Sequence, residues 1–194
     1  MQKKEAAEVD ELAGRCLAAF VESGSLDVSL DRLAERVGVS KRMLIHYFGS
    51  RENLEERAFA LLEDRLRARF RADLFPAGTL LLTVVTALWE QTTAPESRGV
   101  LLVIMDATRR GWSGSERARA FYREQQRLWV EVLMSFLPDA AAVEELLQLF
   151  QGAVLVYLVT GDRDQGRRSL ERMIRRERPS APGLNNRVTC PIRL

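Results

Sequence analysis

The sequence has few of the residues that enzymes and metal proteins use most. Among its 194 residues are one histidine, His46, and two cysteines, Cys16 and Cys190. Because His46 falls in a segment with another role, no Ser/His/Asp or Cys/His catalytic set can be assembled around a second histidine. Two such cysteines form neither a disulfide framework nor a zinc spacing, and no glycine-rich phosphate loop is present. We therefore expect no enzyme, no metal and no cofactor.

Proline and long apolar runs are also scarce. Only six prolines are present, which leaves long uninterrupted stretches and favours helices. No N-terminal stretch resembles a signal peptide, and we expect no run of about 20 apolar residues that could span a bilayer. We therefore expect a cytoplasmic protein without membrane contact. Lys and Arg number 29 against 27 Asp and Glu, so overall charge is poor evidence for nucleic acid.

The most informative segment begins at Ser29, where two short amphipathic helices flank a glycine. Ser29 can cap the first helix, whose apolar residues follow at spacings of three and four. Gly38 then gives the backbone freedom for a tight turn. Ser40 can cap the second helix, in which Leu44 and Phe48 face inward. This pattern is a helix-turn-helix, whose second helix fits the major groove of DNA.

Local charge supports DNA binding better than the overall charge does. Four basic residues and no acidic one lie between Arg36 and Arg51. We expect Lys41, Arg42 and His46 to face the groove. Phosphate contacts, made through hydroxyl groups, helix N-termini or charge, are expected at Ser29, Ser40, Tyr47 and Arg51. The full set of residues predicted to bind DNA is Ser29, Ser40, Lys41, Arg42, Met43, Ile45, His46, Tyr47 and Arg51.

These stretches resemble the TetR family of transcriptional regulators over about the first quarter of the chain. The matching parts are Ala18 to Gly24, Ser29, Leu33-Ala34, Gly38-Val39-Ser40, Leu44 to Phe48 and Arg51 to Leu54. Two departures matter: Arg42 stands where the family usually has Gly, and Ile45 where it usually has a phosphate-contacting Tyr. An extra cation and a missing hydroxyl should change the DNA contacts without changing the fold.

The resemblance implies an all-α homodimer, most often a repressor that binds a palindromic operator. A small effector then binds in the larger domain and moves the fourth helix, which changes the separation of the two recognition helices. We expect a three-helix helix-turn-helix domain over residues 1–50 and a helical ligand-binding and dimerisation domain over 51–178, with a connecting helix at 51–72. Residues 179–194 have neither periodicity nor a core face, which predicts a disordered tail.

Further helices are expected in the second domain from the spacing of apolar residues and of turn residues. They should run from Pro76 to Thr93, Ser97 to Arg110, Ser115 to Leu137, Asp139 to Val159 and Asp162 to Arg178.

Large side chains on these helices have two interpretations. They can fill the core, or several can line a ligand cavity between helices, which the resemblance favours. The candidates are Trp89, Met105, Trp112, Phe121, Tyr122, Trp129, Phe150 and Tyr157. Since few charges are expected to point inward, we expect a hydrophobic effector of drug or metabolite size, with Tyr122 or Tyr157 as a polar anchor.

The stretch from Leu146 to Val159 is apolar on nearly every side. Such a helix must be covered all round, either as the central helix of a monomer or by a second subunit. The resemblance places it, with the Arg-rich helix that follows, in a four-helix dimer interface. The candidate interface residues are Leu147, Gln151, Gly152, Val154, Leu155, Leu158, Leu170 and Ile174.

One alternative for the whole chain remains open. A helical interaction or dimerisation module, whose helix-turn-helix no longer binds specific DNA, is suggested by the Ile45 departure.

Overall fold

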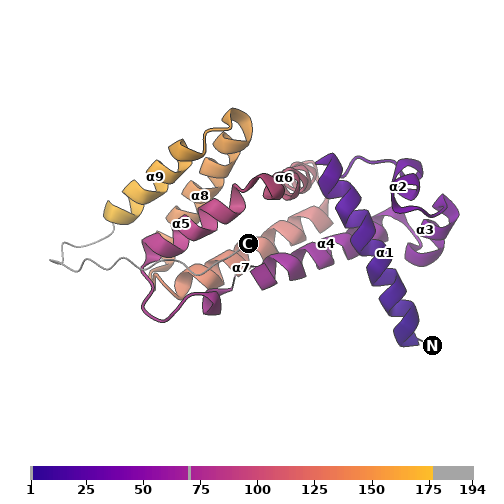
Figure 1. The fold of residues 1–194 in the computed structure, drawn as a ribbon, viewed down its shortest axis with the longest axis horizontal. Coiled ribbons are helices and arrows are strands. Elements are labelled where there is room, and N and C mark those ends of the chain that lie inside the picture. The colour runs from indigo at the N-terminus through magenta and orange to yellow at the C-terminus, as the bar shows by residue number, and fades with distance from the viewer. Residues whose placement is uncertain (1, 70, 177–194) are drawn as a thin grey trace.

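The structure, a computed structural model, describes residues 2–69 and 71–176. This part of the chain consists of helices and connecting turns without a strand (Figure 1), so the predicted all-α fold is confirmed. The described α-helices are α1 (Gln2–Ser23), α2 (Leu30–Val37), α3 (Lys41–Phe48), α4 (Arg51–Arg69), α5 (Leu81–Thr92), α6 (Arg98–Trp112), α7 (Glu116–Met134), α8 (Ala140–Thr160) and α9 (Arg163–Arg176). The predicted tail at 179–194, with Cys190, lies outside the described residues.

Local signals begin and end the two short helices α2 and α3. The hydroxyl oxygen of Ser29 accepts a hydrogen bond from the Arg32 amide at 3.3 Å, and that of Ser40 accepts one from the Met43 amide at 3.2 Å. Gly38 ends α2 with φ of 71°, in the left-handed region that favours glycine. The capping serines and the glycine turn predicted from the sequence are confirmed.

The end of the molecule that holds α2 and α3 has its own core. Helices α2 and α3 lie at one end of the elongated fold, against α1 and α4, and α8 and α9 lie at the other (Figure 1). Buried residues of α1 to α4 form one cluster, which also includes Val103 and Ala107 of α6 and Phe121 of α7. Through this core α6 packs against α1, and α7 packs against α4.

A second core joins α5, α7, α8 and α9 around Trp89. The indole Nε1–H of Trp89 donates to the Arg163 carbonyl at 3.1 Å, and its ring meets Phe150 and Tyr157 at centroid distances of 5.6 and 6.3 Å. A Cβ at Gly166 would lie 2.4 Å from the indole ring. The glycine therefore lets α9 approach Trp89 closely.

Two expectations about the second domain were wrong. The helix predicted from Pro76 begins only at Leu81, because the amide and hydroxyl of Thr79 both donate to the Pro76 carbonyl and close a turn. In addition, α8 is long and apolar enough to cross a membrane by length and composition alone, although no such run was expected. Its five leucines and four valines raise the mean hydropathy despite two glutamates and two glutamines.

A close crossing between α1 and α6 gives the first prediction. A Cβ at Gly99 of α6 would lie 2.2 Å from the carbonyl oxygen of Val21, a backbone atom that cannot turn away. We predict that Gly99→Ala lowers the free energy of unfolding by about 1–3 kcal/mol, because α6 must move off α1. Gly14→Ala is the control, since the nearest atom there is the end of the Arg65 side chain at 3.5 Å.

Urea unfolding measures both variants. Gly14→Ala should raise the free energy of unfolding by about 0.5–1 kcal/mol, the usual gain for alanine over glycine inside a helix. An equal gain for Gly99→Ala would contradict the close crossing.

Candidate nucleic-acid interface and ligand cavity

Helix α3 is fixed by two side chains and exposes the others. Leu44 and Phe48 are buried in the first core. Five of the residues predicted to bind DNA lie exposed on the helix: Lys41, Arg42, Met43, Ile45 and His46. The sixth, Tyr47, is half-buried and meets the His46 ring edge-on at 5.5 Å. The helix thus presents one mixed basic and apolar face to solvent.

The two cations of α3 differ in their surroundings. Lys41 Nζ lies 2.9 Å from Asp31 Oδ2, so part of its charge is neutralised within the protein. Within the described part of the chain, Arg42 makes no hydrogen bond or ion pair. Its guanidinium is therefore the more available of the two for an outside partner.

The capping serines keep a proton to donate. Ser29 and Ser40 use their hydroxyl oxygens as acceptors for helix amides, which leaves each O–H free to donate to another acceptor. Both residues are exposed at the N-terminal ends of α2 and α3, where the helix dipole favours an anion. The geometry at both positions is compatible with a phosphate contact.

Arg51 is a correction to the predicted set. Its guanidinium donates to the carbonyl oxygens of Val28 and Leu26, and its Nε donates to Glu55 at 2.8 Å. The side chain is 22% exposed. Arg51 therefore holds the loop before α2 in place, and its charge is not available to a phosphate as predicted.

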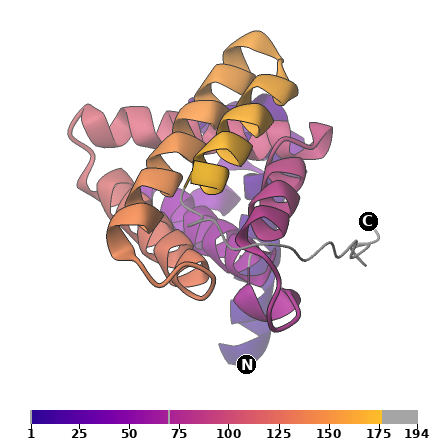
Figure 2. The same ribbon diagram turned by 90° about the vertical axis from the view of Figure 1, so that its left-hand side faces the viewer.

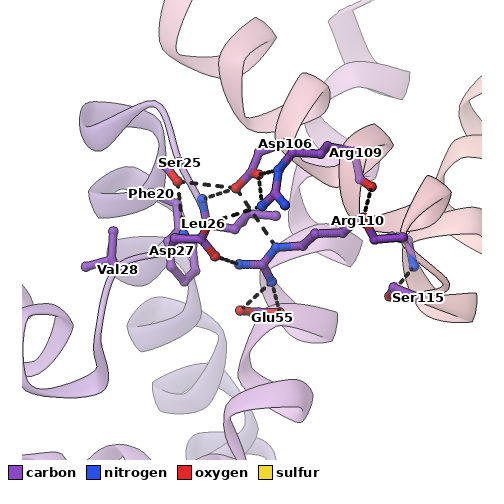
Figure 3. A network of polar contacts seen from close by, with 12 residues as sticks. Phe20, Ser25, Leu26, Asp27, Val28, Glu55, Asp106, Arg109, Arg110 and Ser115 are labelled. Atoms are coloured by element: carbon purple, nitrogen blue, oxygen red, sulfur yellow. Dashed lines mark hydrogen bonds and ion pairs between the residues drawn. The ribbon is translucent and has the colours of Figure 1, made fainter.

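A polar network that the sequence analysis missed ties the loop before α2 to α6 (Figure 3). The Asp106 carboxylate accepts from the Leu26 amide at 2.8 Å and from the Ser25 hydroxyl at 3.2 Å. Arg110 donates to Asp27 at 2.6 Å and to Glu55 of α4 at 3.0 Å. The network, which we call the α6 clamp, joins three segments far apart in the sequence.

Burial and hydrogen bonding act on Asp106 in opposite directions. Burial raises the pKa of its carboxyl, but the Leu26 amide and the guanidinium groups of Arg109 and Arg110 more than offset this and hold the pKa below its usual range. The carboxylate side chain is 11% exposed. The only sequence signal for the clamp is the spacing of three and four from Asp106 to Arg109 and Arg110 on one helix.

A cavity of about 470 Å³ lies between α4, α6, α7 and α8, near the end of α5. Of the predicted pocket residues, Met105, Phe121, Tyr122, Trp129 and Phe150 lie on its walls. Three others are corrected. Trp89 and Tyr157 belong to the packed second core, and the Tyr157 hydroxyl donates to the Thr93 carbonyl. Trp112 ends α6 on the surface, 89% exposed.

The predicted interface residues divide between the interior and the surface of the chain. Leu147, Val154, Leu170 and Ile174 are buried within the chain, so they do not form an outer face as predicted. Gln151 and Leu158 are half-buried, while Gly152 and Leu155 are exposed. An apolar stripe runs along the exposed side of α8 through Gly152, Leu155, Val156 and Val159, the last being 80% exposed. Gly152 and Leu155 also line the cavity. Periodicity alone could not say which side of this apolar helix faces inward.

Among the described residues, no group of three or more His, Cys, Asp or Glu side chains is arranged to hold a metal ion.

The comparisons with known proteins agree with this geometry. Residues 17–58 match the family model described as bacterial regulatory proteins, tetR family. No curated protein matches the sequence. A putative TetR-family transcriptional regulator from Rhodococcus sp. has a TM-score of 0.68 at 18% identity, over 87% of this chain and 97% of that one.

Two further solved structures are similar over nearly the whole chain. A tetR-family transcriptional regulator from Streptomyces coelicolor has a TM-score of 0.67 at 19% identity, over 88% of each chain. A putative TetR-family transcriptional regulator from Mesorhizobium loti MAFF303099 has a TM-score of 0.66 at 15% identity, over 89% of this chain and 95% of that one. All three are described as TetR-family transcriptional regulators, two of them as putative. Residues 17–58, which contain α2 and α3, thus resemble the tetR family of bacterial regulatory proteins, and the chain shares its fold with three solved TetR-family structures.

Proposed function

We propose that the protein is a homodimeric transcriptional repressor that binds a palindromic operator and releases it when a small hydrophobic effector enters the cavity. The observation that carries this proposal is the exposed face of α3, on which Arg42 stands free just after the capped start of the helix. A function on DNA also implies that the protein works in the cytoplasm.

Each exposed side chain of α3 has a role on DNA that its chemistry supports. Arg42 carries the planar fork that pairs with the O6 and N7 atoms of guanine in the major groove. Met43 and Ile45 can contact the methyl groups of thymine, and His46 can donate or accept at a base edge. Ser29 and Ser40 orient the protein by donating to phosphates on either side.

The second prediction concerns Arg42. On an operator fragment selected from the source genome, Arg42→Ala should weaken binding by about 1–3 kcal/mol, and much less on random DNA, if the side chain pairs with guanine. Arg42→Lys keeps the charge without the fork, so it should recover binding to random DNA but not to the operator. Fluorescence anisotropy with both DNAs measures this. Equal losses on both would make Arg42 a phosphate contact.

The stripe on α8 supports a dimer. Figure 2 looks onto α8 and α9, which lie side by side at the end of the molecule away from α3. Exposed apolar residues that follow one face of a helix favour a partner, and a twofold axis there would present two copies of α3 to a palindrome. Gly152 within the stripe would let a partner helix approach closely.

The third prediction tests the dimer with Gly152→Arg. A Cβ at this position meets nothing within 4 Å inside the chain, so the monomer should still fold. We expect the variant to sediment as a monomer and to lose tight operator binding at the same time, because the long arginine side chain prevents the partner helix from approaching. Ala68→Arg, on the exposed side of α4, is the control and should remain dimeric. Wild-type protein that sediments as a monomer at micromolar concentration would refute the interface.

The α6 clamp supports a route from the cavity to the DNA. Ile104 and Met105 of α6 line the cavity, and Asp106 on the same turn holds the loop before α2. Leu66 and Arg69 of α4 line it as well. An effector that displaces α6 or α4 therefore moves the loop before α2, and the two copies of α3 no longer meet both half-sites.

The fourth prediction concerns the pH dependence of the clamp. Because the folded pKa of Asp106 is lowered, its stabilisation is complete above the unfolded pKa of about 4 and is lost as the pH falls through the folded value. Asp106→Asn should lower the free energy of unfolding by about 1.5 kcal/mol at pH 7. The difference between wild type and variant should shrink as the pH approaches 3. A difference independent of pH would exclude the charge of Asp106 as its cause.

The exposed Ile45 favours a second candidate function. Without the usual tyrosine hydroxyl at this position, the protein could act as an interaction module that binds no specific DNA. Gel-shift titration of genomic fragments at several salt concentrations separates the two: a regulator shifts selected fragments, whereas the module shifts none or all alike.

A further inference from the structure

Two buried polar groups on the cavity wall lack hydrogen-bond partners. Thr92 at the end of α5 is 8% exposed and Gln125 in the middle of α7 is 7% exposed. Within the described part of the chain, neither Thr92 Oγ1 nor Gln125 Nε2 has a partner, and both residues line the cavity. Buried polar groups are nearly always paired, so this pair needs an explanation.

Neighbouring polar groups on the same wall are satisfied by the protein itself. The Ser97 hydroxyl donates to the Gln91 carbonyl at 2.8 Å, and the Thr108 hydroxyl donates to the Ile104 carbonyl at 2.9 Å. The Tyr122 hydroxyl donates to Gln151 Oε1 at 3.3 Å. The unpaired groups of Thr92 and Gln125 are therefore not a general property of the cavity wall.

The remaining lining restricts the charge of an occupant. Among the described residues that line the cavity none is a carboxylate, so a cation would be desolvated there without a counter-charge. The one cation in the lining, Arg69, donates to the Gln91 carbonyl at 3.5 Å. Most other lining residues are aliphatic or aromatic, which suits an apolar body with few polar atoms.

A second hollow indicates how an occupant is oriented. It has a volume of about 450 Å³ and shares Leu66, Gln125 and Trp129 with the cavity. Much of its remaining lining is charged: Arg67, Arg71, Asp73, Arg127 and Glu131. Gln125 thus stands where an apolar space meets a polar one, which is where the polar end of an amphiphilic molecule would lie.

We propose that the cavity binds a neutral, largely apolar molecule through an accepting oxygen, such as that of an aromatic ketone. The oxygen accepts from the Gln125 carboxamide, while the apolar body lies among Ile104, Met105 and Phe150. The Thr92 hydroxyl is the donor for a second oxygen where the molecule has one. This inference rests on the proposed role of the cavity as an effector site and adds the chemical class of the effector.

The probes are fluorenone and fluorene, rigid molecules that differ by a carbonyl in place of a methylene group. Equilibrium dialysis with the full chain should give about three- to tenfold tighter binding of fluorenone, the range expected for one net hydrogen bond. In Gln125→Leu this ratio should fall to about one, with the affinity for fluorene retained. Gln126→Leu, which changes another cavity glutamine, is the matched control and should keep the ratio.

The stability of the free protein gives an independent measurement. Because Gln125→Leu removes an unpaired buried donor, it should raise the melting temperature by about 2–4 °C, and Gln126→Leu should not. Thr92→Val, which removes the other unpaired group, should raise it as well. A lower melting temperature for Gln125→Leu would show that its amide is already satisfied in the free protein.

Other outcomes overturn the proposal. Equal affinities of wild-type protein for fluorenone and fluorene would show that the ligand needs no accepting oxygen. An affinity ratio that is unchanged in Gln125→Leu would show that Gln125 does not recognise such an oxygen. Tighter binding of fluorene-9-carboxylate would make the ligand an anion.

Failure of the proposed function can be told apart from failure of the ligand class. Preference for fluorenone without any release of the operator would leave the ligand class standing and refute the effector role of this cavity. Release of the operator by both probes, without a preference for the ketone, would refute only the ligand class.

Discussion

The position of α6 is the constraint on which the rest of the structure depends. Its Val103 and Ala107 belong to the core of the end that holds α2 and α3, and its Ile104 and Met105 line the cavity. Gly99 brings it against the backbone of α1. One helix therefore forms part of both functional regions, so neither region can change shape without moving it.

The α6 clamp ties the loop before α2 to the position of α6. Arg110 joins Asp27 before α2 to Glu55 of α4, and Glu55 also pairs with Arg51, which holds the same loop. Because Arg110, Glu55 and Arg51 are partly shielded from water, separating Glu55 from either arginine leaves a poorly solvated charge behind. A displaced α6 is thus expected to carry the loop with it, which gives the cavity a route to α3 through charge contacts.

Local signals in the sequence predicted local structure well, whereas the positions of side chains set by distant contacts could not be predicted. Ser29, Ser40 and Gly38 act on their immediate neighbours, so spacing alone located the helix-turn-helix. The inward turn of Arg51 depends on carbonyl groups more than 20 residues away. For the same reason, Trp89 and Trp112 were grouped as pocket residues, although one lies in a packed core and the other on the surface.

The most direct test of the account is the affinity of the full chain for a selected operator fragment as a function of salt. Lys41 and Arg42 of two subunits bring four cations to the phosphate-lined groove, and neutralising four phosphate charges would reduce affinity on the order of a hundredfold between about 50 and 200 mM salt. The account predicts a loss of this order and two chains bound to each palindromic fragment. Affinity that does not depend on salt, or one chain per fragment, would contradict it.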